Sequence, residues 1–240
     1  MTQRLTLDQL ICKTYYCGAV VLLLINGCRG YPGRIGPAGL EPLDAATASN
    51  WAAEFQPQQA ARYDLRWTYT TQRGSVRGRA SVRVAPPDSL RFDYRGPFGR
   101  SGAAVVVGDG VIWSEPEEDV DQLIPVAPLF WAALGVAREP PADAAVFGLE
   151  TATQRIWQYV TGGDTLSYVV TGEPPYRLQA EMRSFDAVVG LVELEYDDST
   201  RAPVEATMSF PASASIFLLS VENLETVASF GPDTWKRPPD

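Results

Sequence analysis

The side chains that most often carry catalysis are scarce in this chain. Its 240 residues include no histidine and three cysteines, Cys12, Cys17 and Cys28. Ser-His-Asp or Cys-His catalysis and histidine-ligated metal sites are therefore excluded. Carboxylates are plentiful, but the acidic run Glu115–Asp121 contains a proline and is typical of a solvated loop. Since no convincing pair of facing carboxylates is visible, we expect no enzyme, no metal site and no cofactor.

Cys28 has the clearest chemical context of the three thiols. Arg4 and Lys13 come before an apolar run of about 11 residues that ends near Ile25, and Gly27 stands directly before the cysteine. Such a run is too short to span a bilayer, which takes roughly 20 residues. The pattern predicts a secretory leader over residues 1–27, and the cysteine at the junction resembles a bacterial lipobox. We expect lipid, such as palmitate, on Cys28; the alternative is an ordinary leader that is cleaved elsewhere.

Cleavage before Cys28 would leave the mature chain with a single cysteine. Cys12 and Cys17 would depart with the leader, so no internal disulfide can form. A lone thiol in an exported protein needs an explanation, and thioether lipidation supplies one. The formal net charge of −9 argues against a nucleic acid partner, because phosphate neutralisation dominates that affinity.

The elements that must position any site follow a tether. Residues 28–43 are rich in glycine and proline and show no periodicity, which predicts a flexible tether. Residues 44–240 have the size of one domain. Asp44 is a good N-cap for a short alanine-rich helix up to Phe55, and Pro57 would end it.

Beyond Pro57 the apolar residues alternate with polar ones, as in half-buried antiparallel strands. A hairpin is predicted around Gly108–Gly110, and strands resume from about Ala145 to Val221. Between them, residues 123–135 are apolar, non-alternating and interrupted by prolines, which predicts one or two short helices ending at Gly135. Many short strands with these turns imply a sandwich, a barrel or one strongly bent sheet.

The apolar face of these elements is unusually aromatic. It is either an ordinary core or the lining of a pocket for an apolar ligand, with the helical segment as plug or lid. The expected lining residues are Leu65, Trp67, Tyr69, Leu90, Phe92, Tyr94, Trp113, Phe130 and Trp131. The opposite face carries arginines, which form a solvated surface or contact anionic headgroups or an acidic partner; they are Arg62, Arg66, Arg77, Arg79, Arg83, Arg91 and Arg95.

The segment Ser89–Ala103 consists of a strand, a Pro-apolar-Gly turn and a second strand, and a tryptophan-bearing hairpin follows. This arrangement resembles the LolA/LolB superfamily of periplasmic lipoprotein carriers and outer-membrane lipoprotein receptors. The helical segment from Ile124 to Gly135 falls where that family has its lid. The resemblance covers about Trp51 to Trp113, and the rest by strand order only. It implies a mainly β fold: a single curved antiparallel half-barrel of about 11 strands, with short helices covering an apolar cavity.

Cys28 makes the chain similar to LolB, the lipoprotein of that superfamily. LolB-like proteins expose an apolar residue on a turn to engage the membrane, and Phe98 occupies the matching turn; the alternative is that Phe98 folds back on the sheet rim. Arg29 suits outer-membrane sorting, because the inner-membrane retention signal in this system is typically an aspartate there.

The resemblance therefore implies a protein anchored by lipid at the periplasmic face of the outer membrane. It would bind acyl chains of lipoproteins or lipids in the apolar cavity, help to place them in the outer membrane, and have a soluble periplasmic carrier as partner. The alternative is a non-transporting envelope lipoprotein, a sensor or scaffold with the same fold. A cavity filled by Trp67, Phe92 and Trp131 would favour that alternative.

Overall fold

The computed structural model describes residues 39–117, 124, 126–172, 177–200 and 202–237. The predicted leader, Cys28 and the tether up to residue 38 lie outside the described residues, as does the rest of the acidic run after Glu117. Within the described part, no helix is long and apolar enough to cross a membrane.

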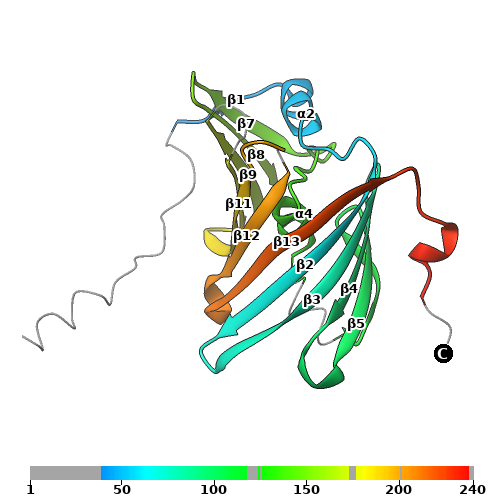
Figure 1. Cartoon of the computed structure of the whole chain (residues 1–240). Coiled ribbons are helices and arrows are strands. Elements are labelled where there is room, and N and C mark those ends of the chain that lie inside the picture. The colour runs from blue at the N-terminus through cyan, green and yellow to red at the C-terminus, as the bar shows by residue number, and fades with distance from the viewer. Residues whose placement is uncertain (1–38, 118–123, 125, 173–176, 201, 238–240) are drawn as a thin grey trace, which may run out of the picture. The chain divides into compact units, whose positions relative to one another are not determined.

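One antiparallel sheet of thirteen strands forms the domain (Figure 1). Its spatial order is β1-β7-β8-β9-β10-β11-β12-β13-β2-β3-β4-β5-β6. The long strand β13 lies between β12 and β2, and it joins a first half, β2–β6, to a second half, β1 and β7–β12. The strands are β1 (Glu41–Pro42), β2 (Ala60–Thr71), β3 (Gly74–Ala85), β4 (Ser89–Arg95), β5 (Ser101–Val107), β6 (Gly110–Glu115), β7 (Ala145–Glu150), β8 (Gln154–Thr161), β9 (Asp164–Thr171), β10 (Arg177–Ser184), β11 (Ala187–Tyr196), β12 (Pro203–Phe210) and β13 (Ser215–Val227).

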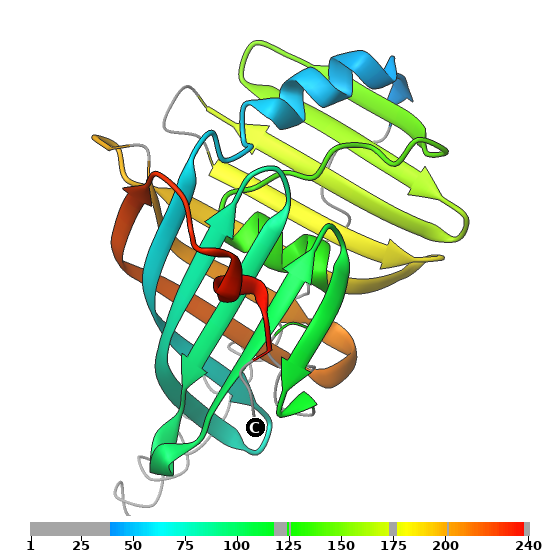
Figure 2. The ribbon, with the colours of Figure 1, turned by 90° about the vertical axis from the view of Figure 1, so that its right-hand side faces the viewer.

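The sheet is strongly curved and not closed into a barrel, which confirms the predicted half-barrel (Figure 2). Two helices pack on its concave face. Helix α2 (Ala45–Ala53) begins where predicted, with the backbone N–H of Thr47 donating to the Asp44 carboxylate at 3.2 Å. Helix α4 (Ala127–Ala133) lies deeper, against β10, β11 and β12, and the chain leaves it through Gly135 at φ +83°.

The folded domain begins earlier than the predicted tether boundary at residue 43. Glu41 and Pro42 pair with Gly148 and Phe147 of β7, and the N–H of Leu43 donates to the Val146 carbonyl at 2.9 Å. Because β7 is otherwise the outermost strand on this side, the short strand β1 covers part of its edge.

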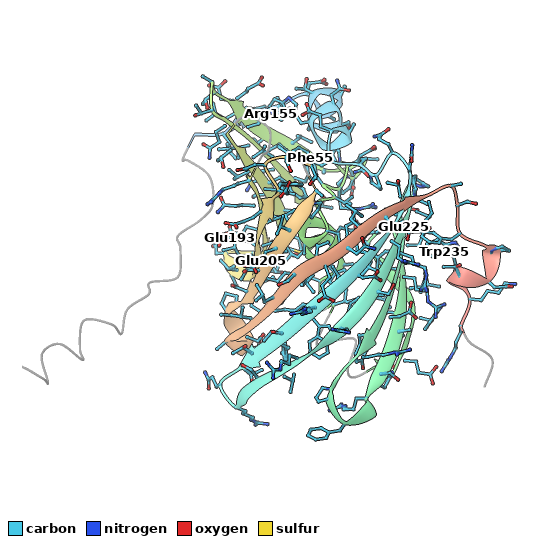
Figure 3. All side chains as sticks on the ribbon, in the orientation of Figure 1. Phe55, Arg155, Glu193, Glu205, Glu225 and Trp235 are labelled. Atoms are coloured by element: carbon cyan, nitrogen blue, oxygen red, sulfur yellow. The ribbon has the colours of Figure 1, made fainter. Side chains whose placement is uncertain are left out.

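A C-terminal strap, residues 228–237, crosses the convex face of β4–β6 and was not predicted. It contains the 3-10 helix η3 (Pro232–Trp235). Arg91 donates to the Thr234 carbonyl at 2.8 Å, and the indole N–H of Trp113 donates to the Trp235 carbonyl at 3.2 Å. Figure 3 places Trp235 outside the sheet, beyond the strands of this half.

Candidate functional site: the concave face and its rim

The concave face of β2–β4 places large aromatic side chains opposite very small residues. Trp67 is paired with Gly78, and Tyr94 lies between Ala80 and Gly102 on the neighbouring strands. A Cβ atom at Gly78 would lie 2.6 Å from the Trp67 ring, and one at Gly102 would lie 2.5 Å from the Tyr94 ring. The rings therefore lie flat over neighbouring strands, because the residues beneath them have almost no side chain.

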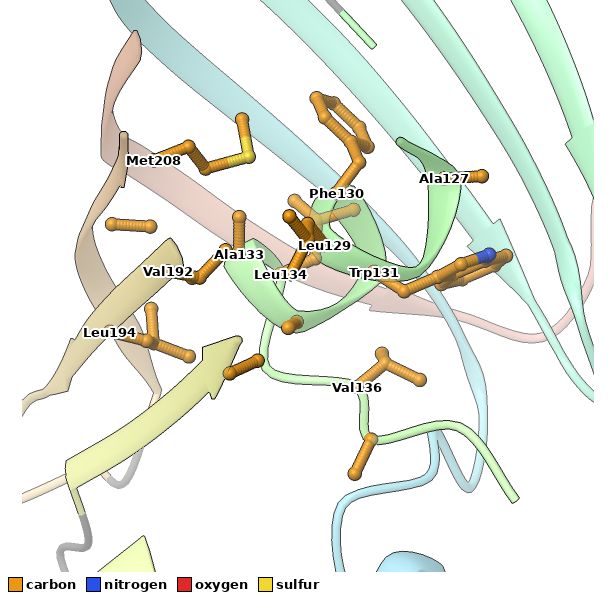
Figure 4. Packing of buried hydrophobic residues seen from close by; sticks show 14 of the residues in the cluster. Ala127, Leu129, Phe130, Trp131, Ala133, Leu134, Val136, Val192, Leu194 and Met208 are labelled. Atoms are coloured by element: carbon orange, nitrogen blue, oxygen red, sulfur yellow. The ribbon is translucent and has the colours of Figure 1, made fainter. Parts of the chain in front are cut away.

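Helix α4 occupies the hollow above these rings. Apart from the indole N–H of Trp131 its side chains carry no polar group, as expected for a helix that is buried on all sides. Phe130 meets Phe92 edge to face with ring centroids 5.2 Å apart, and Leu129 packs where Gly190 leaves room on β11. Figure 4 shows α4 between Val192, Leu194 and Met208 on one side and the strands facing Phe130 on the other.

Polar contacts of α4 are few and lie at one end. The indole N–H of Trp131 donates to the Gly108 carbonyl at 2.8 Å, and the guanidinium of Arg138 lies 5.5 Å from the Trp131 ring. No side chain caps the N-terminus of the helix, where Pro128 stands in the first turn. The helix is thus held mainly by apolar burial, which is non-directional and which another apolar group could replace.

Most of the predicted lining residues meet in this cluster. Trp67, Tyr94 and Phe92 form a chain of ring contacts, and Phe217 links Trp67 to Tyr69. Leu65 and Leu90 are buried in the same core, as are Phe130 and Trp131. Sequence reasoning did not single out Phe217, Leu129 or Met208, although Phe217 lies in a predicted strand and its alternation with Leu219 was a usable signal.

Trp113 was predicted to line the concave face, and that prediction is wrong. In the register of β5 and β6, Val105 pairs with Trp113 and Val106 pairs with Val111. Ile112 is therefore a bulged residue, which reverses the alternation and turns Trp113 to the convex face. There its ring lies 5.4 Å from the guanidinium of Arg91, beneath the strap.

A second aromatic group lies beneath α2 at the other end of the concave face. Trp157 contacts Trp51, Phe55 and Tyr168, with the Trp157 and Tyr168 rings stacked 5.3 Å apart. Arg155, labelled with Phe55 in Figure 3, holds the helix end through two hydrogen bonds to Glu54, and this hydrogen bonding lowers the pKa of the Glu54 carboxyl. This group completes a continuous apolar interior from α2 to α4.

Phe98 stands on the rim, in the turn between β4 and β5. Its side chain is fully exposed, with a relative accessibility of 103%, and its backbone adopts φ +57°. A left-handed conformation is costly for a residue with a side chain, and a large apolar side chain in water adds to the cost. The structure therefore presents Phe98 to solvent instead of folding it back on the sheet rim.

The convex face of the same half carries a polar trough of about 870 Å³. Arginines and carboxylates line it together with Ser81, Ser101 and Trp113. Asp93 bridges Arg83 and Arg91 at 2.5 and 2.8 Å, so part of the predicted arginine face is neutralised by local ion pairs. Among the described residues, no group of His, Cys, Asp and Glu is arranged to hold a metal ion.

Comparison with solved structures identifies the architecture. A LolA superfamily protein from Nitrosomonas europaea superposes with a TM-score of 0.54 at 13% identity, over 81% of this chain and 98% of that chain. The chain has a LolA/LolB-like fold. An outer membrane lipoprotein-sorting protein domain from Vibrio parahaemolyticus matches this LolA/LolB-like chain with a TM-score of 0.53 at 10% identity, over 80% of this chain and 97% of that chain. No protein-family model and no curated protein sequence matches the chain.

Proposed function

We propose that this protein is a lipid-anchored protein of the bacterial cell envelope that binds acyl chains of lipoproteins or lipids. The acyl chains would lie on the concave face, in the space now filled by α4, and the protein would help to place them in the outer membrane. The observation that carries this proposal is the wholly apolar helix α4, set on an aromatic concave face in a LolA/LolB-like fold. No catalytic step is required.

Exchange of α4 for an acyl chain is energetically reasonable. Leaving water is worth about 0.8 kcal/mol per methylene group, so an acyl chain gains many kcal/mol on binding. Displacing α4 uncovers Leu129, Phe130 and Trp131, and the acyl chain must cover the same concave surface. The free energy gained by burying the acyl chain is offset by the free energy lost when α4 leaves the concave face, so net binding stays weaker than insertion into a bilayer. That balance allows a carried chain to be released into a membrane.

The proposed location at the membrane rests on Cys28 and on Phe98. Lipid on Cys28 would hold the domain at the membrane, and Phe98 would enter the bilayer surface from the β4–β5 turn. The partners are then acyl chains of lipoproteins or lipids, a membrane and a soluble periplasmic carrier that delivers the cargo. Replacing Phe98 with glutamate is expected to reduce delivery to the membrane, and unchanged delivery would remove this role from the loop.

The decisive experiment locks α4 in place. A Cβ at Gly190 would lie 2.6 Å from Cδ1 of Leu129, so Leu129→Cys and Gly190→Cys put two thiols on facing positions of α4 and β11, and mass spectrometry of the oxidised protein checks that they cross-link. We expect the oxidised double variant to lose binding of a fluorescent fatty acid and the reduced form to regain it. The single variant Leu129→Cys is the matched control and is expected to bind in both redox conditions.

A second function is favoured by one observation, the tight packing of the concave face. Trp67, Phe92 and Trp131 are buried to 4, 0 and 1% accessibility, as expected of a non-transporting sensor or scaffold with the same fold. The disulfide experiment separates the two. Equal probe binding by the oxidised and reduced forms would contradict displacement of α4. No probe binding by the native protein, together with no lipid in its organic extract, would leave the non-transporting function.

A further inference from the structure

Three arginines form a row across the convex face of the β2–β4 half. Arg66 lies directly opposite Arg79, and Arg79 lies directly opposite Arg95 in the registers of β2, β3 and β4. The Arg66 and Arg79 side chains are 66 and 74% exposed, and Arg95 is exposed as well. Like charges directly opposite one another on neighbouring strands repel and destabilise a sheet. Such a row needs counter-charges.

The carboxylates that line the trough neutralise one end of the row only. Glu222 forms an ion pair with Arg66, and its other oxygen lies 3.9 Å from Nε of Arg79. The remaining acids are engaged elsewhere: Asp93 with Arg83 and Arg91, Asp64 with Arg62, and Glu115 with Arg237. Within the described part of the chain, no carboxylate lies within ion-pair distance of Arg95.

The unneutralised end of the row lies at the base of the turn that bears Phe98. Arg95 is the last residue of β4, and the N–H of Gly96 donates to the Arg100 carbonyl at 2.8 Å to close the turn. Arg79, Arg95 and Ser101 line the same trough, and Arg95 and Ser101 flank the turn that exposes Phe98. Figure 2 shows the β4–β5 turn projecting from the rim of the sheet.

We infer that Arg79 and Arg95 bind the phosphate of an anionic lipid headgroup while Phe98 enters the bilayer beside it. Guanidinium groups match phosphate geometry through paired hydrogen bonds, and a basic residue near an anionic surface contributes attraction that neutral lipid cannot supply. The inference deepens the proposed membrane contact of Phe98 by naming the lipid class. It does not depend on acyl binding beneath α4.

The test measures how fast an arginine-specific reagent modifies Arg95 in the purified full-length protein reconstituted in nanodiscs. Phenylglyoxal labelling read by mass spectrometry reports Arg95 and, in the same sample, Arg177, a 74% exposed arginine on the other half of the sheet. Nanodiscs of phosphatidylcholine are compared with nanodiscs containing phosphatidylglycerol. We expect phosphatidylglycerol to slow labelling of Arg95 about fivefold and to leave Arg177 unchanged.

Two further arms make the result decisive. Phe98→Gly is expected to abolish the protection of Arg95, whereas Phe185→Gly, the same change at another exposed phenylalanine with positive φ, is expected to keep it. Inorganic phosphate added to phosphatidylcholine nanodiscs is expected to give no protection. Equal labelling in both nanodiscs, equal protection of Arg177, or protection by free phosphate alone would each overturn the inference. The fatty-acid binding assay remains a separate readout of the proposed function.

Discussion

The convex faces of the two halves of the sheet differ in polarity and burial. On β2–β4 the convex face is polar and carries ion-paired arginines, while on β8 and β9 its centre is buried: Ile156 and Val169 are each 1% exposed, although neither belongs to the concave core. The strands β2–β4 therefore alternate between buried and more exposed residues, as half-buried strands do, whereas Ile156–Tyr159 on β8 and Ser167–Val170 on β9 are buried without a break. An alternation of apolar and polar residues identifies a strand with one face in solvent. It cannot identify a strand that is buried on both faces.

Alkaline unfolding gives the largest expected effect and is dominated by the second half. Burial raises the pKa of Tyr159 on β8, Tyr168 on β9 and Tyr196 on β11, and raises that of Tyr63 on β2 from 10.0 to about 12. A raised pKa means that the folded state holds the proton more tightly. This stabilisation is complete below pH 10 and is lost as the pH rises through the folded pKa values.

We therefore expect the melting temperature to fall steeply above about pH 10, with tyrosinate absorbance rising in the same transition that loses circular dichroism. Calorimetry and absorbance between about pH 8 and 12 check this. A gradual rise that reaches the full absorbance of all ten tyrosines while the fold persists would show that these hydroxyl groups are open to solvent.

Two substitutions in one lateral row of the sheet test directly whether the convex face differs in burial between the two halves. Ile156 and Thr68 belong to one lateral row of the sheet, connected through Val169, Gln179, Glu193, Thr207 and Leu218. We expect Ile156→Ala to lower the free energy of unfolding by about 3 kcal/mol, because it leaves a cavity, and Thr68→Ala to change it by less than about 0.5 kcal/mol. Urea unfolding measures both, and equal losses would contradict the asymmetry.

The smallest expected effect is a difference in the free energy of unfolding between two turn substitutions, one in each half of the sheet. Phe98 and Phe185 both have positive φ, but the Phe185 ring packs on Gly163, where an added Cβ would lie 2.7 Å from it. Phe98→Gly is expected to raise the free energy of unfolding by about 1 kcal/mol, because glycine adopts this backbone freely. Phe185→Gly loses ring packing and is expected to gain less. Thermal melts of the two variants decide the order.

Sequence reasoning recovered the elements better than their packing. The helix that begins after Asp44 and the hairpin around Gly108–Gly110 follow from local chemistry, namely a cap and a turn, so short windows suffice. The face of Trp113 could not be predicted, because a single bulged residue reverses alternation without a sequence signal. The strap was also missed, since the contacts at its centre are backbone carbonyls that accept from Arg91 and Trp113, and any residue can supply a carbonyl.

The bulge at Ile112 also affects how neighbouring molecules meet. Strand β6 is one border of an open sheet, and a straight border offers a row of free N–H and C=O groups to a strand from another chain. A bulged residue breaks the even spacing of that row and increases the local twist. The bulge that turns Trp113 outward therefore also disfavours edge-to-edge aggregation of the open sheet. This effect matters most where many copies lie close together on one surface.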